Sequence, residues 1–294
     1  MSQTATTTRS RDLPFDGASL TARVTTRRIA LRTAGRRQGS ITRLVSPGDV
    51  GQLIKPFVFL DHAEVAHTGE KLSGIHPHSG IATLTTVLQG GLAYEDTTGK
   101  QGEVVRGGLE WMKAGKGVWH DGGALPGEAL RAFQLWVALP ATEELAPAES
   151  QYVSPDSVET DGPVRVVLGR HGRARSIIRA PEGINYFHVR LNDGERWRYT
   201  PPAGHTVAWL AVDTGRLHAS ELVGSGEVAV FDESQEAIEV LAEGETSFVF
   251  GSAIKHPHPL VLGYYSVHTS AAALAAGEAE IRRIGQRLHA AGRV

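Results

Sequence analysis

The chain contains the stretch Ile75-His76-Pro77-His78-Ser79-Gly80, and a second stretch, Gly115-Lys116-Gly117-Val118-Trp119-His120, places another histidine 42 residues after His78. Side chains alternate between the two faces of a β-strand, so His76 and His78 point the same way if the first stretch is extended. A third imidazole, His120 on a neighbouring strand, would complete a corner of three nitrogen ligands. Neutral imidazole suits iron, nickel, copper and zinc, and three ligands on one side leave positions for water, dioxygen or a small substrate. The pattern predicts a mononuclear metal site within a β-fold.

Length and composition limit the class of protein. The chain has 294 residues, enough for about two domains of roughly 150 residues each. Its net charge of −2 gives no general attraction to nucleic acid, and it shows neither a signal peptide nor an apolar run of roughly 18 residues. We therefore expect a cytoplasmic protein without membrane association or direct nucleic-acid contact. Because the chain has no cysteine, redox chemistry would need a bound metal or an organic cofactor.

The strand pattern indicates an all-β protein. From Leu44 onward, apolar runs of four to eight residues alternate with Gly, Pro, Asn and Asp, as is typical of β-sandwiches and barrels. Pro140–Ser150 interrupts this pattern, which then resumes, so we interpret it as a linker between two similar β-halves. The predicted domains are 1–145, with the candidate metal site, and 146–294. Apolar residues at helical spacing predict a C-terminal α-helix over 270–287.

The start of the chain is rich in arginine. We expect it to be a frayed tail leading into an edge strand around Arg27–Thr33, because charged edges discourage the addition of further strands.

Three stretches carry a resemblance to a known family. The chain resembles the pirin family over a match from about Arg28 to Gln286. The stretches that carry the resemblance are His76-Pro77-His78-Ser79-Gly80, Glu110–His120 and the ending Gly263–Thr269 before a helix. The resemblance implies a bicupin, with two antiparallel jelly-roll β-barrels face to face and a metal in the N-terminal barrel only. In this family three histidines and one glutamate hold the metal, usually iron. Some members resemble flavonol (quercetin) dioxygenases, and others act as transcriptional or metabolic co-regulators.

The family's three histidines correspond to His76, His78 and His120, but its glutamate has no counterpart. The expected position, two residues after His120, is Gly122, and the general cupin alternative, four residues after His78, is Ala82. Without an anionic ligand, a divalent ion keeps its full charge, so metal affinity should fall and an anionic ligand should be favoured. In flavonol dioxygenation the family's glutamate takes the proton of the substrate hydroxyl. Its loss therefore removes a general base.

Other polar residues are expected to lie away from the site. Asp121 should point to the face opposite His120, and Glu95, Asp96 and Glu110 are interpreted as solvated surface charges. The motif His256-Pro257-His258 is interpreted as a loop, since its prolines interrupt a regular ladder. Three histidines of the second half are interpreted as core residues of a metal-free barrel: His188, His205 and His218. Ser79 lacks a nucleophile elbow, which gives little support to a hydrolase triad.

An apolar lining for a substrate is expected from five residues of the first half: Leu84, Val87, Trp111, Met112 and Trp119. Three functions stay open. The protein is an oxygenase of a flavonol (quercetin-like) or catechol-like small molecule, a regulator whose metal or oxidation state alters binding to a protein partner, or a metal-free scaffold. In the scaffold, the histidines would bond one another or water. Iron(II) is the expected metal, with nickel, copper, zinc and manganese as alternatives.

Overall fold

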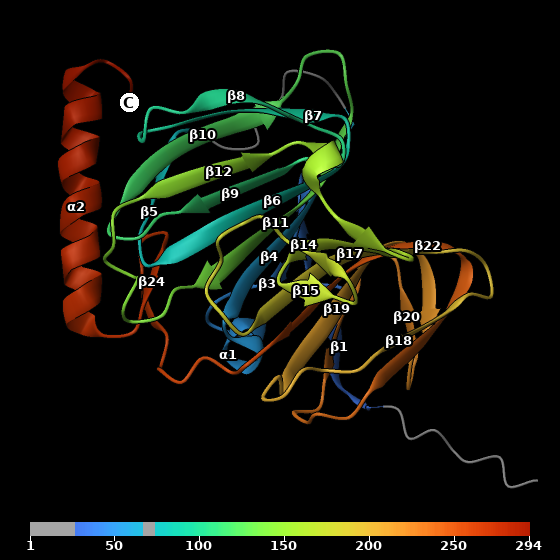
Figure 1. Cartoon of the computed structure of the whole chain (residues 1–294). Coiled ribbons are helices and arrows are strands. Elements are labelled where there is room, and N and C mark those ends of the chain that lie inside the picture. Colours follow the sequence, from blue (N-terminus) through green and yellow to red (C-terminus); the bar gives the residue numbers. More distant parts are fainter. Residues whose placement is uncertain (1–26, 67–73) are drawn as a thin grey trace, which may run out of the picture.

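The structure, a computed structural model, describes residues 27–66 and 74–294 (Figure 1). The arginine-rich tail expected before Arg27 therefore lies outside the described residues.

The first barrel consists of two antiparallel sheets. The seven-stranded sheet has the order β12 (Glu149–Val153), β9 (Leu109–Lys113), β6 (Ile81–Gln89), β11 (Leu130–Ala138), β4 (Phe57–Val65), β3 (Ile41–Val45) and β2 (Arg36–Gln38). The four-stranded sheet has the order β5 (His76–His78), β10 (Val118–Ala124), β7 (Gly91–Asp96) and β8 (Gln101–Val105). The short helix α1 (Val50–Ile54) connects β3 to β4.

The second barrel is built on a nine-stranded sheet. Its main path runs β1 (Ile29–Thr33), β21 (Val228–Phe231), β19 (Val207–His218), β22 (Ile238–Ala253), β17 (Ile184–Leu191), β14 (Val164–Leu168) and β13 (Thr160–Asp161). Two more strands pair off this path: β18 (Arg196–Tyr199) with β22, and β20 (Leu222–Gly224) with β19. The remaining elements are a 3-10 turn (Pro155–Ser157), the pair β15 (Arg170–His171) and β16 (Ala174–Arg175), the pair β23 (Val261–Gly263) and β24 (Ser266–His268), and helix α2 (Ala271–Ala290). The predicted all-β bicupin with a C-terminal helix is confirmed.

Each barrel contains a strand from the other half of the chain. The early strand β1 is an edge strand of the second sheet, whereas β12, which begins within the last two residues of the predicted linker, pairs with β9 in the first barrel. Helix α2 stands along the first barrel, where the Trp119 indole donates a hydrogen bond of 2.8 Å to the Ile281 carbonyl (Figure 1). The domain limits 1–145 and 146–294 stay a prediction. The end of the chain nevertheless contributes directly to the first barrel.

Helix α2 begins as the sequence predicts. The Ser270 side chain accepts a hydrogen bond from the Ala273 amide, which satisfies one of the free donors of the first turn. The buried positions of α2, including Ile281, Ile284 and Leu288, recur at helical spacing and face the barrel. No helix within the described ranges is long and apolar enough to span a lipid bilayer.

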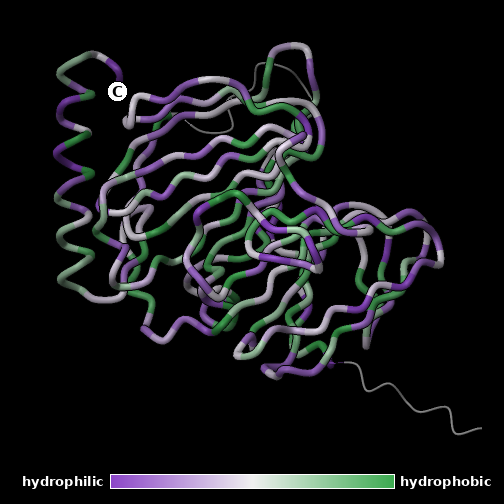
Figure 2. Tube along the Cα trace, viewed as in Figure 1, coloured by the Kyte–Doolittle hydropathy of each residue, from purple (hydrophilic) through white to green (hydrophobic). Residues whose placement is uncertain are grey.

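The largest hydrophobic cluster joins the two barrels. It contains Trp111 from the first barrel and Tyr186 and Trp209 from the second, all fully buried. The Phe57 ring contacts Trp209 edge to face, with centroids 5.4 Å apart. Figure 2 shows hydrophobic segments concentrated where the strands of the two barrels meet. Because aromatic side chains bury large areas, this contact fixes one barrel against the other.

Candidate metal centre

The three predicted ligands come from two paired strands. In the antiparallel pair of β5 and β10, His76 lies opposite His120 and His78 lies opposite Val118. His76 and His78 are separated by one residue and therefore share a face of β5. Gly80 then turns the chain with φ +74°, and a Cβ there would lie 2.0 Å from the Val267 carbonyl oxygen. The glycine that ends the motif thus permits the close approach of the C-terminal segment.

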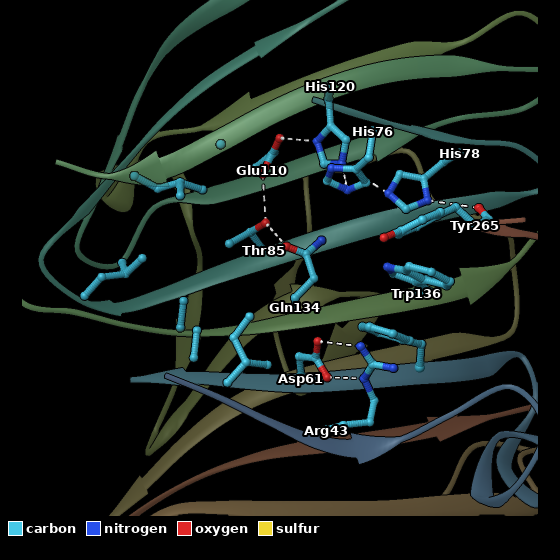
Figure 3. A pocket seen from close by; sticks show the side chains of 17 residues that line it. Arg43, Asp61, His76, His78, Thr85, Glu110, His120, Gln134, Trp136 and Tyr265 are labelled. Carbon is cyan, nitrogen blue, oxygen red and sulfur yellow. Dashed lines mark hydrogen bonds and ion pairs between the residues drawn. The ribbon is translucent and has the colours of Figure 1, made fainter. Parts of the chain in front are cut away.

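The imidazoles converge on one point. The Nε2 atom of His120 lies 3.1 Å from Nε2 of His78 and 3.0 Å from Nε2 of His76. Candidate ligand atoms of the three residues all lie within 4.8 Å of one another, and Figure 3 shows the rings facing the same space. The structure therefore brings together the residues that the sequence selected.

Backbone carbonyls orient two of these rings. His76 Nδ1 donates to the Gly74 carbonyl at 2.8 Å, and His78 Nδ1 donates to the Tyr265 carbonyl at 3.1 Å. A carbonyl only accepts, so each Nδ1 carries the hydrogen, and in the neutral ring Nε2 presents its lone pair to the centre. Metal-binding histidines are oriented by such outer hydrogen bonds.

Burial keeps these rings neutral. It lowers the pKa of His76, lowers that of His78 well below its usual value and lowers that of His120 to about 3; nearby imidazoles add repulsion at His78 and His120. Neutral imidazoles whose lone pairs meet at one point form a donor set that fits a divalent transition metal.

Glu110 is not the surface charge expected from the sequence. It is 3% exposed and lines the same cavity, with Oε1 3.9 Å from His120 Nδ1, within ion-pair distance but beyond a hydrogen bond. Thr85 Oγ1 lies 2.8 Å from Glu110 Oε2 and 2.9 Å from Gln134 Oε1 (Figure 3). Burial raises the pKa of Glu110 to about 7. The pairing of β9 with β6 places it opposite Thr85, another polar residue on the same face, and the sequence alone does not specify this register.

The other acidic residues considered in the sequence, Glu95, Asp96 and Asp121, do not line the cavity. Asp96 was expected at the surface but is 8% exposed, and it accepts hydrogen bonds from Ser150 and Tyr152. Glu95 is exposed and pairs with Arg293. Asp121 does not line the cavity, as expected from its alternation with His120.

The cavity beside the histidines has a volume of about 260 Å³. A row of polar residues crosses its wall, each opposite the next on neighbouring strands: Arg43, Asp61, Gln134, Thr85 and Glu110. Aromatic rings lie beside this row on the same sheet, with Phe59 stacked on Trp136 at a centroid distance of 4.0 Å. Figure 3 shows the Arg43–Asp61 pair across the cavity from the histidines. The site therefore offers an aromatic pair and a row of polar groups on one sheet, with the histidines on the other.

The predicted apolar lining is wrong. The apolar part of the wall comes instead from β3, β4, β7 and β11, and its members are Ile41, Phe59, Ala63, Leu92, Leu130, Ala132 and Trp136. The inward residues of β6 and β9 are Thr85 and Glu110, so their neighbours Leu84 and Trp111 point to the contact between barrels. A shift of one residue exchanges the two faces of a strand.

The C-terminal segment reaches the site through a buried chain of polar groups, which the sequence did not reveal. Ser79 Oγ lies 2.8 Å from Ser266 Oγ and 3.0 Å from His268 Nε2, and His268 Nδ1 lies 3.0 Å from Glu144 Oε2. This serine, histidine and glutamate form a triad-like row, but Ser79 is fully buried and can meet no substrate. The row instead fastens β24, and with it Tyr265, beside His78.

The remaining histidines form no second cluster of potential metal ligands within the described ranges. His188 and His205 are buried, as expected, and contact Ser247 and Ser252. The interpretation of His218 as a core residue is wrong, because its side chain is exposed and pairs with Glu243. The segment from His256 to His258 lies outside the strands and helices, as expected.

The two positions at which a carboxylate was sought differ in their surroundings. Gly122 lines the cavity, whereas Ala82 is fully buried and does not. A Cβ at Gly122 would make only ordinary contacts, at 3.5 Å from the Ala93 carbonyl oxygen and 3.7 Å from Leu92 Cδ1. The backbone therefore has room for a side chain where the resemblance places the glutamate.

Fold and site together define a bicupin with a three-histidine centre in its first barrel. The family model described as Pirin matches residues 38–137. A pirin-like protein of Caulobacter vibrioides is 31% identical over 192 residues, which are 61% of this chain and 68% of that protein. The chain belongs to the pirin family.

Two further comparisons agree with this assignment. A putative quercetin 2,3-dioxygenase of Pseudomonas aeruginosa is 28% identical over 239 residues, which are 76% of this chain and 83% of that protein. The crystal structure of a quercetin 2,3-dioxygenase from Acinetobacter baumannii superimposes with a TM-score of 0.80 at 22% identity, covering 88% of this chain and 98% of that one. The structural likeness shows the shared fold.

Proposed function

We propose that His76, His78 and His120 hold one divalent transition metal and that the protein is a dioxygenase of a flavonol- or catechol-like small molecule. The observation that carries the proposal is the convergence of neutral imidazoles on a cavity with an aromatic wall and a polar row. Iron(II) is the expected ion, with nickel, copper, zinc or manganese as alternatives. When bound, it would supply Lewis-acid activation of an enol or catechol hydroxyl and a site for dioxygen.

The cavity's own residues suit a planar aromatic ligand. Phe59 and Trp136 provide a stacked apolar wall, against which an aromatic ring can pack. Arg43 uses Nε and Nη2 to hold Asp61, so among the described residues Nη1 is left to donate to a polar substituent at the far end of the ligand. Its guanidinium lies 4.0 Å from the Phe59 centroid, which holds it against the same wall.

Glu110 takes the place of the family's carboxylate in this proposal. Gly122 stands where the resemblance places that glutamate, and Glu110 faces the same space from β9. Thr85 orients its Oε2, and its Oε1 lies toward His120. A carboxylate in this position can accept a hydrogen bond from a substrate hydroxyl.

Metal analysis of untagged protein is the first test. We expect near-stoichiometric metal in the wild type and its loss in His76→Ala/His78→Ala. The variant His256→Ala/His258→Ala removes the other His-Pro-His motif and should keep the metal. Equal metal content in both double variants would overturn the site.

The reaction is tested separately with the metal-loaded protein. Oxygen uptake should follow addition of quercetin or 4-methylcatechol and be lost in His120→Ala. A loaded protein that consumes no oxygen with either probe would contradict the dioxygenase, and the proposals of a regulator with a protein partner or of a scaffold would take its place.

A further inference from the structure

An arginine-rich cleft lies at the junction of the two barrels. Arg106 and Arg131 come from the first barrel, and Arg165 and Arg190 come from β14 and β17 of the second (Figure 1). Two cavities of about 250 and 480 Å³ share Arg190 in their walls. Neither shares a lining residue with the cavity at the metal centre. The cleft is therefore a separate site.

Strand register brings the cationic groups of the second barrel onto one face. Arg165 on β14 lies opposite His188 on β17, and Arg190 follows His188 by two residues. Ser247 on β22 lies opposite Arg190, and its Oγ is 3.0 Å from His188 Nε2. These groups consequently point together toward the first barrel.

His188 carries an unused donor position. The residue is only 3% exposed, and it lines the smaller cavity. Its Nδ1 atom has no hydrogen-bond partner among the described residues. If the Ser247 hydroxyl donates to Nε2, Nδ1 bears the hydrogen of the neutral ring. A buried donor without a partner costs free energy, so a ligand atom that accepts from it is favoured.

Positive charge in the cleft is only partly balanced. Arg131 Nε lies 2.9 Å from Asp213 Oδ1, and Arg165 donates to two neutral carbonyls, those of Gly107 and Pro155. Arg106 and Arg190 have no salt bridge within the described part of the chain, and Glu245 is the one carboxylate among the residues that line the two cavities. Burial and the proximity of Arg190 lower the pKa of Arg165. Like charges held this close are stabilised by an added anion.

We propose that this cleft binds the phosphoryl group of a small phosphorylated molecule. A phosphoryl group has several acceptor oxygens and up to two negative charges, so arginines on both barrels and His188 Nδ1 can contact it together. The inference does not depend on the proposed dioxygenase, because it uses other residues.

The test is calorimetric titration of the full chain with inorganic phosphate and pyrophosphate, at an ionic strength held constant with chloride. The variant Arg106→Gln/Arg190→Gln should bind about tenfold more weakly than wild type, since each loses a charge-assisted hydrogen bond. The matched control Arg173→Gln/Arg287→Gln removes the same charge at exposed positions outside the cleft and should bind normally.

Two further measurements make the outcome decisive. The His188 imidazole NMR signals should shift on addition of phosphate, and His76→Ala/His78→Ala should keep full affinity. Equal weakening in the cleft variant and the charge control would overturn the proposal, as would loss of phosphate binding in the metal-centre variant.

Discussion

His78 Nδ1 and the carbonyl oxygen of Tyr265 lie 3.1 Å apart, although the two residues are separated by 187 positions in the chain. Tyr265 has φ +52° and is the one non-glycine residue with positive φ in the described ranges. Such a conformation costs about 1 kcal/mol or more and persists where the surroundings enforce it. Here the Ser79–Ser266 contact and the row to His268 hold it in place. The end of the chain thus orients His78, a candidate metal ligand of the first barrel.

The Tyr265 carbonyl is tested by two substitutions that both remove the ring. Tyr265→Gly accepts the positive φ, whereas Tyr265→Pro cannot, because its φ is near −65°. We expect metal affinity about tenfold to a hundredfold weaker in the proline variant than in the glycine variant, since His78 loses its orienting acceptor. Chelator competition measures this, with circular dichroism confirming folding. Equal affinities in the two variants would show that the carbonyl does not matter.

Gly122→Glu should restore a carboxylate to the metal centre. A Cβ at Gly122 would meet no atom closer than 3.5 Å, and the residue lines the cavity. We expect tighter metal binding, by about tenfold, because an anionic ligand offsets the ion's charge. Gly123→Glu is the matched control, since alternation points it to the other face and a Cβ there meets nothing within 4 Å. A similar gain in both variants would contradict a specific ligand.

Two of the candidate ligands, His76 and His78, could be predicted because their arrangement is local. One intervening residue places His76 and His78 on the same face of a strand, and the pirin resemblance supplied His120. The C-terminal helix was predictable for the same reason, from its spacing and its Ser270 cap.

Glu110 and Tyr265 could not be placed in this way. Which face Glu110 occupies depends on the register of β9 against β6, and a run of apolar neighbours does not specify it. Tyr265 reaches the site only because the chain returns to the first barrel after completing the second. Both placements are decided by contacts between distant segments.

Glu110→Gln tests the carboxylate behind His120. The substitution keeps the shape and a hydrogen-bonding group for Thr85 but removes a carboxyl group 3.9 Å from His120 Nδ1, which is negatively charged above its pKa of about 7. We expect metal affinity to fall by about tenfold. Glu95→Gln removes an exposed carboxylate that pairs with Arg293 and should have little effect. An unchanged dissociation constant for Glu110→Gln would exclude this electrostatic role.

Gly277→Ala tests the docking of α2. In an open helix this change would stabilise by about 1 kcal/mol. Here the new Cβ would lie 2.5 Å from His268 Nε2 and 2.6 Å from Ser79 Oγ, so we expect a net loss of about 1–3 kcal/mol in urea unfolding. The exposed change Ala275→Gly calibrates the helical contribution alone. A stabilised Gly277→Ala would show that the contact is loose.

His188 makes the fold sensitive to acid. Burial, followed by the charges of Arg190 and Arg165, lowers its pKa from 6.5 to about 3, with Arg131 acting in the same direction and Asp213 opposing them. Between these two values the unfolded chain binds more protons than the native protein. The free energy of unfolding therefore rises with pH across this range and is lost as the pH falls.

Replacing the imidazole should remove this acid sensitivity. Between pH 6.5 and 4, wild type should lose up to about 3 kcal/mol of unfolding free energy more than His188→Gln, because glutamine does not titrate. The control His218→Gln changes an exposed histidine paired with Glu243 and should follow the wild-type curve. Urea unfolding at several pH values measures the difference. Parallel curves for wild type and His188→Gln would mean that His188 is protonated in the native protein, and hence that an anion or water already compensates the surrounding arginines.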